Sequence, residues 1–129
     1  MVSRSRALVL TLSIAALGAG LYACSGPEGQ IETVVAGGDA ERGRTALDGF
    51  GCGTCHVIPG VRGAVGAVGP PLSGFAQRAY IAGQLPNQPE NLLRWVQDPQ
   101  EVEPGTAMPD LGVGPAVARD MAAYLYTLR

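Results

Sequence analysis

Three side chains with reactive chemistry stand together near the middle of the chain. Cys52 and Cys55 are separated by two residues, and His56 follows directly. Two thiols at this spacing can form thioethers to the neighbouring vinyl groups of a haem, and the adjacent imidazole is then held beneath the iron. The motif therefore predicts one haem c, attached covalently through Cys52 and Cys55 and ligated by His56.

Two other kinds of chemistry use the same pair of cysteines. A Cys-x-x-Cys pair also serves as a redox-active disulfide or as half of a zinc site. Neither of these needs the adjacent histidine, and a zinc site requires further ligands. The chain has one His and three Cys in all, and the third cysteine, Cys24, lies far outside the motif. The haem interpretation is therefore favoured.

Methionines provide the candidates for the second axial ligand. Because the chain has no second His and no Lys, the choices are Met108, Met121 or no protein ligand. Met108 lies on a loop rich in Pro and Gly, residues 104–109, which can carry a side chain to the far face of a haem. Met121 lies on the apolar stripe of a predicted helix, where core packing is the ordinary role of a methionine. We expect Met108 to be the ligand, and a thioether ligand favours reduced iron.

The composition excludes several other functions. All nine basic residues are Arg, so a Walker phosphate loop, a Schiff base and a lysine general base are excluded. Removal of the first 23 residues would leave seven Arg against eleven acidic residues, a formal charge of about −4, so nucleic acid is not an expected partner. With 19 Gly and 10 Pro, much of the backbone must form loops, and a large cofactor would give these loops a surface to pack on.

The N-terminal residues indicate export. Residues 1–23 carry two arginines followed by an uncharged, mostly apolar stretch, which is typical of a signal peptide. The signal ends in Leu-Tyr-Ala before Cys24, which resembles a bacterial lipobox, whose cysteine is acylated; an uncleaved signal anchor is the alternative. Residues 24–38 would then be the acylated Cys24 and a flexible tether. We expect the domain to be membrane-anchored by lipidated Cys24 and to face the periplasm or cell exterior.

Three helices are predicted within residues 39–129. The first extends from an N-cap at Asp39 to about Gly49, the second from Pro89 to Gln97, and the third starts at Pro115. The positions expected to face the core are Gly43, Leu47 and Phe50, then Leu92, Leu93, Trp95 and Val96, then Val117, Met121, Tyr124 or Leu125, and Leu128. Pro99 is expected to stop the second helix, and no strand pattern competes. The predicted fold class is all-α, with Gly- and Pro-rich loops around one haem.

Residues 39–129 resemble a small class I cytochrome c, the monohaem family with three main helices. Besides the haem motif, the resemblance rests on the Gly-Pro-Pro-Leu sequence at residues 69–72 and on the methionine loop. It implies that the carbonyl of Pro70 accepts the Nδ1 proton of His56, which fixes the tautomer and leaves Nε2 for iron. It also implies that Met108 is the second ligand and that Trp95 lines the distal pocket.

The same resemblance assigns roles to several other residues. Arg78 and Tyr80 fall where the family contacts the haem propionates, and Gly43 falls where the first helix meets the last, with Tyr124 crossing it. Many family members also have a tryptophan that contacts a propionate, and residues 81–87 contain none. Tyr80 or the side chain of Asn87 could bind the inner propionate instead.

The leading functional prediction is an electron carrier, not an enzyme, in a respiratory chain at the outer face of a bacterial membrane. Its expected partners are a membrane oxidase, reductase or dehydrogenase, and no small-molecule substrate is expected. One alternative is a haem subunit or accessory factor of a larger oxidase or dehydrogenase complex. Another is a ligand-binding or peroxidase-like haem enzyme, which needs an open sixth position and a distal acid or base. The only obvious groups for that role are Glu101, Glu103 and Asp110, for which a solvated loop surface is the simpler interpretation.

Overall fold

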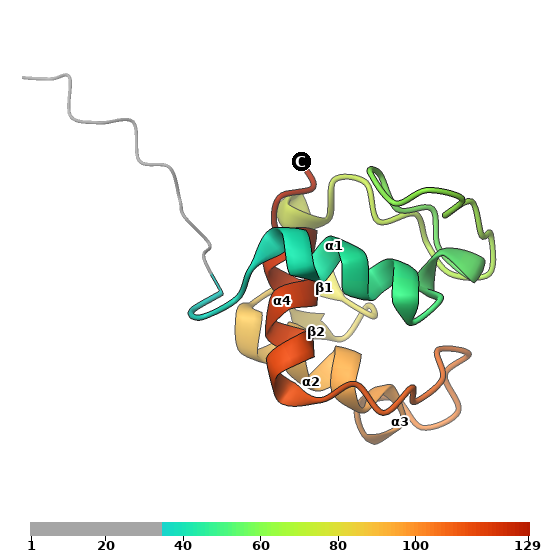
Figure 1. Cartoon of the computed structure of the whole chain (residues 1–129). Helices are drawn as coiled ribbons and strands as arrows, with labels where there is room; N and C mark the ends of the chain where they lie inside the picture. The colour runs from blue at the N-terminus through green and yellow to red at the C-terminus, as the bar shows by residue number, and fades with distance from the viewer. Residues whose placement is uncertain (1–34) are drawn as a thin grey trace, which may run out of the picture. The chain divides into compact units, whose positions relative to one another are not determined.

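The computed structural model describes residues 35–129, and the predicted signal peptide, Cys24 and most of the predicted tether lie outside them. The elements in chain order are α1 (Ala40–Gly49), η1 (Cys52–Thr54), η2 (Phe75–Gln77), β1 (Tyr80–Ile81), β2 (Leu85–Pro86), α2 (Pro89–Gln97), α3 (Pro99–Val102) and α4 (Pro115–Leu125). Figure 1 shows α1 crossing α4, with α2 against another part of α4. The predicted helical class is confirmed.

Helix α1 begins where the sequence predicted and packs closely on α4. The carboxylate of Asp39 accepts a hydrogen bond of 2.8 Å from the backbone N–H of Arg42, as expected of an N-cap. A β-carbon at Gly43 would overlap the backbone carbonyl of Asp120 in α4. Only glycine therefore permits this approach of the two helices, and the predicted close contact at Gly43 is confirmed.

An ion pair also joins the first and last helices. Arg42 Nε lies 2.8 Å from Asp120 Oδ2, and the backbone N–H of Asp39 donates to Asp120 Oδ1 at 2.8 Å. These two hydrogen bonds, with that from Arg42 the larger cause, hold the pKa of the Asp120 carboxyl below its usual value. The start of α1 is thus fixed to α4 by packing and by charge.

The buried core extends beyond the predicted domain boundary. Val35 is only 2% exposed and belongs to the hydrophobic core, although residues up to 38 were expected to form the tether. In α4 the buried residues are Ala118, Met121, Ala122 and Leu125, whereas Val117 is half-buried. Among residues 35–129, no helix is both long enough and apolar enough to cross a bilayer.

Two short elements differ from the predictions. Strands β1 and β2 pair antiparallel, with Ile81 opposite Leu85, around a turn at Ala82 and Gly83, which both have positive φ. Strands of two residues are too short to show an alternating pattern, so the expectation that this region has no strand was wrong. Pro99 does end α2, but it also opens α3, because the side chain of Asp98 caps the new helix.

Candidate cofactor site

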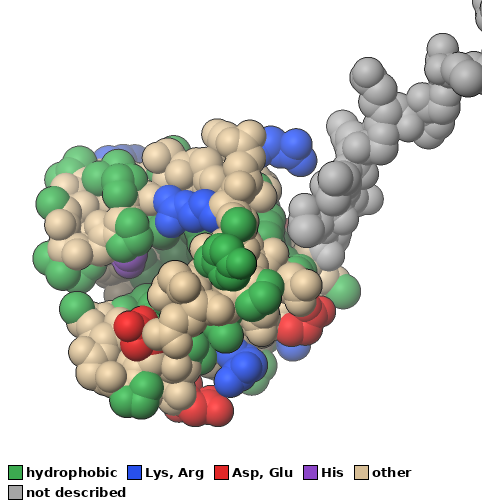
Figure 2. Space-filling model, turned by 180° about the vertical axis from the view of Figure 1, so that it is seen from behind, with side chains coloured by type: hydrophobic (Ala, Val, Ile, Leu, Met, Phe, Trp, Pro, Cys, Tyr) green, Lys and Arg blue, Asp and Glu red, His purple; other side chains and the backbone are tan. Residues whose placement is uncertain are grey.

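The predicted site residues line one cavity of about 400 Å³. Figure 2 shows the hollowed face of the molecule, with hydrophobic side chains on both sides of the hollow. The predicted residues among its lining are Cys52, Cys55, His56, Pro70, Arg78, Tyr80, Trp95 and Met108. Most of the other lining residues are apolar, and they come from α1, α2, α4 and the loops on either side. The structure therefore brings together predicted site residues that are up to 56 positions apart in the sequence, from Cys52 to Met108.

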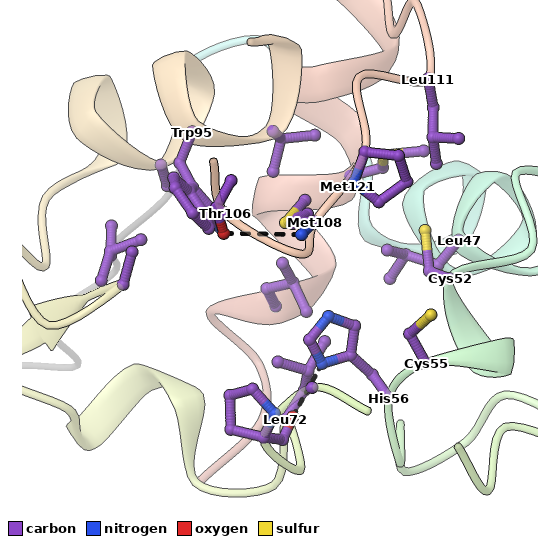
Figure 3. A pocket seen from close by; sticks show the side chains of 18 of the residues that line it. Leu47, Cys52, Cys55, His56, Leu72, Trp95, Thr106, Met108, Leu111 and Met121 are labelled. Carbon is purple, nitrogen blue, oxygen red and sulfur yellow. Dashed lines mark hydrogen bonds between the residues drawn. The ribbon is translucent and has the colours of Figure 1, made fainter. Parts of the chain in front are cut away.

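The cysteine motif folds into one tight turn. Gly51 has a φ of 71° and starts the short helix η1, and the backbone N–H of His56 donates to the carbonyl of Cys52 at 3.0 Å. Figure 3 shows the two thiols beside each other and next to His56. Burial raises the pKa of the Cys52 thiol, whereas redox-active pairs depend on a lowered thiol pKa. The surroundings of Cys52 therefore do not favour the redox-exchange interpretation.

The imidazole of His56 is held by the loop that follows the motif. Its Nδ1 lies 2.8 Å from the carbonyl oxygen of Pro70, the contact that the resemblance implied. If Nδ1 donates this hydrogen bond, Nε2 is left without its proton and can bind a metal. A β-carbon at Gly69 would overlap the imidazole ring, so the ring lies directly against the loop backbone.

Both candidate methionines line the cavity, in different surroundings. Met108 is half-buried on the loop between α3 and α4, and Figure 3 shows it and His56 reaching into the cavity from different stretches of the chain. Met121 has no exposed surface and packs in the core on α4. These surroundings agree with the sequence-based expectation that Met108 lies on a loop beside the site and that Met121 packs in the core.

The residues expected near the propionates divide into two groups. Tyr80 and Arg78 line the cavity, and the Arg78 guanidinium also donates to the carbonyls of Pro71 and Ser73. Asn87 is not part of the lining.

The polar atoms of Asn87 are engaged within the protein. Its Nδ2 donates to the carbonyls of Phe75 at 2.9 Å and Arg78 at 3.0 Å, and its Oδ1 accepts from the Tyr126 hydroxyl at 2.9 Å. The suggested propionate contact from Asn87 is therefore corrected: this side chain ties α4 to the segment that carries Arg78. Of the two groups suggested for the inner propionate, Tyr80 is the one that faces the cavity.

The three acidic residues near the methionine loop have separate environments. Glu101 lies 3.8 Å from Arg94, and the Asp110 carboxylate accepts from the backbone N–H of Gly112 at 2.8 Å. Glu103 lines the cavity and is the one acidic residue among the lining residues. A distal acid or base would therefore have to be Glu103.

Sequence reasoning missed one residue beside the site. Gln100, in α3, makes hydrogen bonds to the loop that carries Met108. An exposed glutamine carries no chemical signal by itself. Asp98 followed by Pro99 is a helix-start pattern, and it would have placed Gln100 on a new helix next to this loop.

The cavity fits a large, mostly apolar group. It has two thiols beside a histidine on one side and a thioether on a separate loop, which are the donors that a covalently attached haem requires. A helical fold built around such a site defines a c-type cytochrome. Residues 40–129 match the cytochrome c family, and the chain belongs to this family.

Two curated relatives have the name cytochrome c oxidase subunit 2. The protein of Alkalihalophilus pseudofirmus is 39% identical over 70 residues, which cover 54% of this chain and 20% of the relative. The protein of Bacillus sp. (strain PS3) is 39% identical over 59 residues, which cover 44% of this chain and 17% of the relative. The chain thus spans a fifth or less of the length of these two relatives.

Proposed function

We propose that this protein transfers single electrons through one haem c, attached through Cys52 and Cys55 and ligated by His56 and Met108. The observation that carries the proposal is that all four side chains line the same largely apolar cavity. When bound, the haem supplies a one-electron iron couple. In this proposal the protein carries electrons from a donor protein to an acceptor protein and catalyses no reaction of its own.

The chain's own residues would keep this site fixed in both oxidation states. The carbonyl of Pro70 would orient His56 and make its imidazole more electron-rich by accepting a hydrogen bond from the Nδ1–H group. Apolar side chains, among them the almost fully buried Leu92, keep water from the cavity wall. Arg78 and Tyr80 are the polar groups placed to meet propionates. Little structural rearrangement should therefore accompany electron transfer.

The two relatives suggest the setting of this transfer. Both have the name of an oxidase subunit, so we propose a membrane cytochrome c oxidase as the electron acceptor or as the complex that contains this chain. A membrane dehydrogenase would be the donor, and a reductase is the alternative acceptor. The predicted lipid on Cys24 would hold the domain at the outer face of the same membrane.

Covalent attachment is tested on the purified protein. The unaltered protein should keep its haem in denaturant and show the added mass of one haem, whereas Cys52→Ala and Cys55→Ala should each give little mature holoprotein. Extraction of the haem into acidified organic solvent would show that the attachment is wrong.

The anchor and the partner are tested in cells. Cys24→Ser should move the protein from the membrane fraction to the periplasmic fraction, provided that the signal is still cleaved. Recovery of the unaltered protein as a soluble periplasmic species would exclude the anchor. Stable co-purification with oxidase subunits would show that the protein is a subunit of the complex. Transient reduction of the oxidase by the separately purified protein would show that it is a carrier.

A further inference from the structure

The methionine loop, residues 104–109, has little backbone structure of its own. Within the described chain, its only backbone hydrogen bond is the one from the N–H of Thr106 to the carbonyl of Glu103, at 3.0 Å. The N–H of Met108 makes a long contact of 3.5 Å with the hydroxyl of Thr106, drawn as a dashed line in Figure 3. Contacts from outside the loop must therefore fix the position of Met108.

One side chain supplies those contacts. The Nε2 of Gln100 donates to the carbonyls of Thr106 and Met108, each at 2.9 Å, and its Oε1 accepts from the N–H of Gly105 at 3.1 Å. The amide thus uses both N–H groups and its carbonyl to bind three residues of the loop. Rotating the amide by 180° would lose all three hydrogen bonds, so the loop conformation and the side-chain orientation specify each other.

The backbone of Gln100 is itself anchored to the core. It belongs to α3, which is capped by Asp98 Oδ1 at 2.9 Å from the N–H of Glu101. Pro99, the residue before Gln100, is among the most completely buried side chains. The glutamine therefore extends from a fixed point, although it is exposed.

We propose that Gln100 is a positioning residue that holds the methionine loop closed and thereby keeps Met108 at the iron. This inference rests on the proposed function, because it takes Met108 as the sixth ligand. Loss of the three hydrogen bonds should favour an open loop, in which Met108 leaves the iron and an external ligand can enter. Each hydrogen bond has a modest net value, so opening should become more frequent while the domain still folds.

The test compares glutamine variants in the holoprotein. Gln100→Leu removes all three hydrogen bonds, and Gln100→Glu keeps only the acceptor for Gly105. Gln97→Leu is the matched control, because Gln97 Nε2 donates at 2.9 Å to Leu93 within its own helix and does not reach the loop. The readouts are the rate of carbon monoxide binding to the reduced protein and the hydrogen exchange of the Gly105 amide.

We expect Gln100→Leu to bind carbon monoxide about tenfold faster or more, which corresponds to about 1.4 kcal/mol in loop closure. The carbon monoxide binding rate of Gln100→Glu should lie between the rates of Gln100→Leu and the unaltered protein. The rate of Gln97→Leu should stay within about twofold of the rate of the unaltered protein. Exchange of the Gly105 amide should accelerate in Gln100→Leu while helical circular dichroism is unchanged.

Two outcomes would overturn the inference and are distinguishable. If Met108→Ala opens the iron to carbon monoxide but Gln100→Leu binds it no faster than Gln97→Leu, Gln100 does not position the loop and the proposed function stands. If Met108→Ala retains the sulfur-to-iron absorption band, Met108 is not the ligand, and both the ligand assignment and this inference are wrong.

Discussion

The two sides of the cavity are held in place by different parts of the chain. On the His56 side, backbone groups bond to each other across the loop: Gly69 donates to Cys55 at 2.8 Å, and Leu72 donates to Val57 at 2.8 Å. On the Met108 side, the described residues show few backbone bonds, and the amide of Gln100 makes three of the contacts.

This difference suits His56 and Met108, the two proposed axial ligands, to different tasks. A ligand that is fixed by backbone bonds and by the proposed thioethers at the neighbouring cysteines would be hard to displace. A ligand on a loop held by side chains can open locally without unfolding the domain, since local opening costs less than global unfolding. Substitutions on the two sides should therefore have different consequences.

The largest effect is expected from a change on the backbone-held side. Gly69→Ala places a methyl group where the imidazole of His56 lies, so the ring or the loop must move. Most of the protein should then lack normal His56 ligation. The fraction of the protein whose attached haem gives the native absorption spectrum should fall severely. Gly114→Ala is the control on the methionine side, because a β-carbon there meets nothing within 4 Å.

A normal spectrum in Gly69→Ala would contradict the tight packing of His56 on this loop. It would also remove the main contrast between the two sides, because the loop that holds His56 would then be as adaptable as the methionine loop.

A second, smaller effect is expected where α1 and α4 cross, because this contact supports both sides alike. Gly43→Ala should lower the free energy of unfolding by about 3 kcal/mol, since the new methyl group meets a backbone carbonyl. Gly49→Ala, in the same helix, has open space and should be neutral or slightly stabilising. Chemical denaturation measures both. Equal stabilities of the two variants would show that the helix crossing is not tight.

The smallest effect is expected from the tyrosine that ties α4 to Asn87. Burial, with a minor contribution from Glu90, raises the pKa of Tyr126 to about 12, above the value of about 10 in an unfolded chain. The unfolded state therefore loses this proton first as the pH rises. The contribution of Tyr126 to the free energy of unfolding is therefore complete below pH about 10. It is lost towards pH 12, and the free energy of unfolding falls by at most about 1.4 kcal/mol per pH unit.

Tyr126→Phe isolates this contribution. It should flatten the fall in stability between pH 10 and pH 12 and should leave the rate of carbon monoxide binding unchanged, because Tyr126 does not line the cavity. An identical pH profile in the variant would show that another group causes the loss.

The sequence predicted the main helices and the cavity lining because these depend on strong local signals. Asp39, Pro89 and Pro115 mark helix starts, and α1 and α2 begin and end within one residue of their predicted limits. Leu128 was predicted to lie on the core-facing side of the last helix. It is buried, but α4 ends at Leu125, so the predicted helix was too long. The cysteine motif brought three site residues together by sequence alone.

The other features depend on contacts between distant residues. Asn87 was matched to a propionate because its position along the chain was compatible, but its partners Phe75 and Tyr126 are known only from the fold. Gln100 was missed in a similar way: Asp98 and Pro99 mark the start of its helix, but the local sequence does not show that the methionine loop folds back onto its side chain. Val35 was assigned to the tether because it lies in a short apolar cluster near glycines. The sequence alone does not show that one residue of this cluster is buried in the core.

The central claim, that His56 and Met108 hold one iron from the two sides of the cavity, is tested most directly by the sulfur-to-iron absorption band of the oxidised protein. We predict that Met108→Ala abolishes this band, whereas Met121→Leu retains it and costs less than about 1.5 kcal/mol of stability as a volume-conserving change. Loss of the band in Met121→Leu with retention in Met108→Ala would contradict the claim and would assign the ligand to the core of α4.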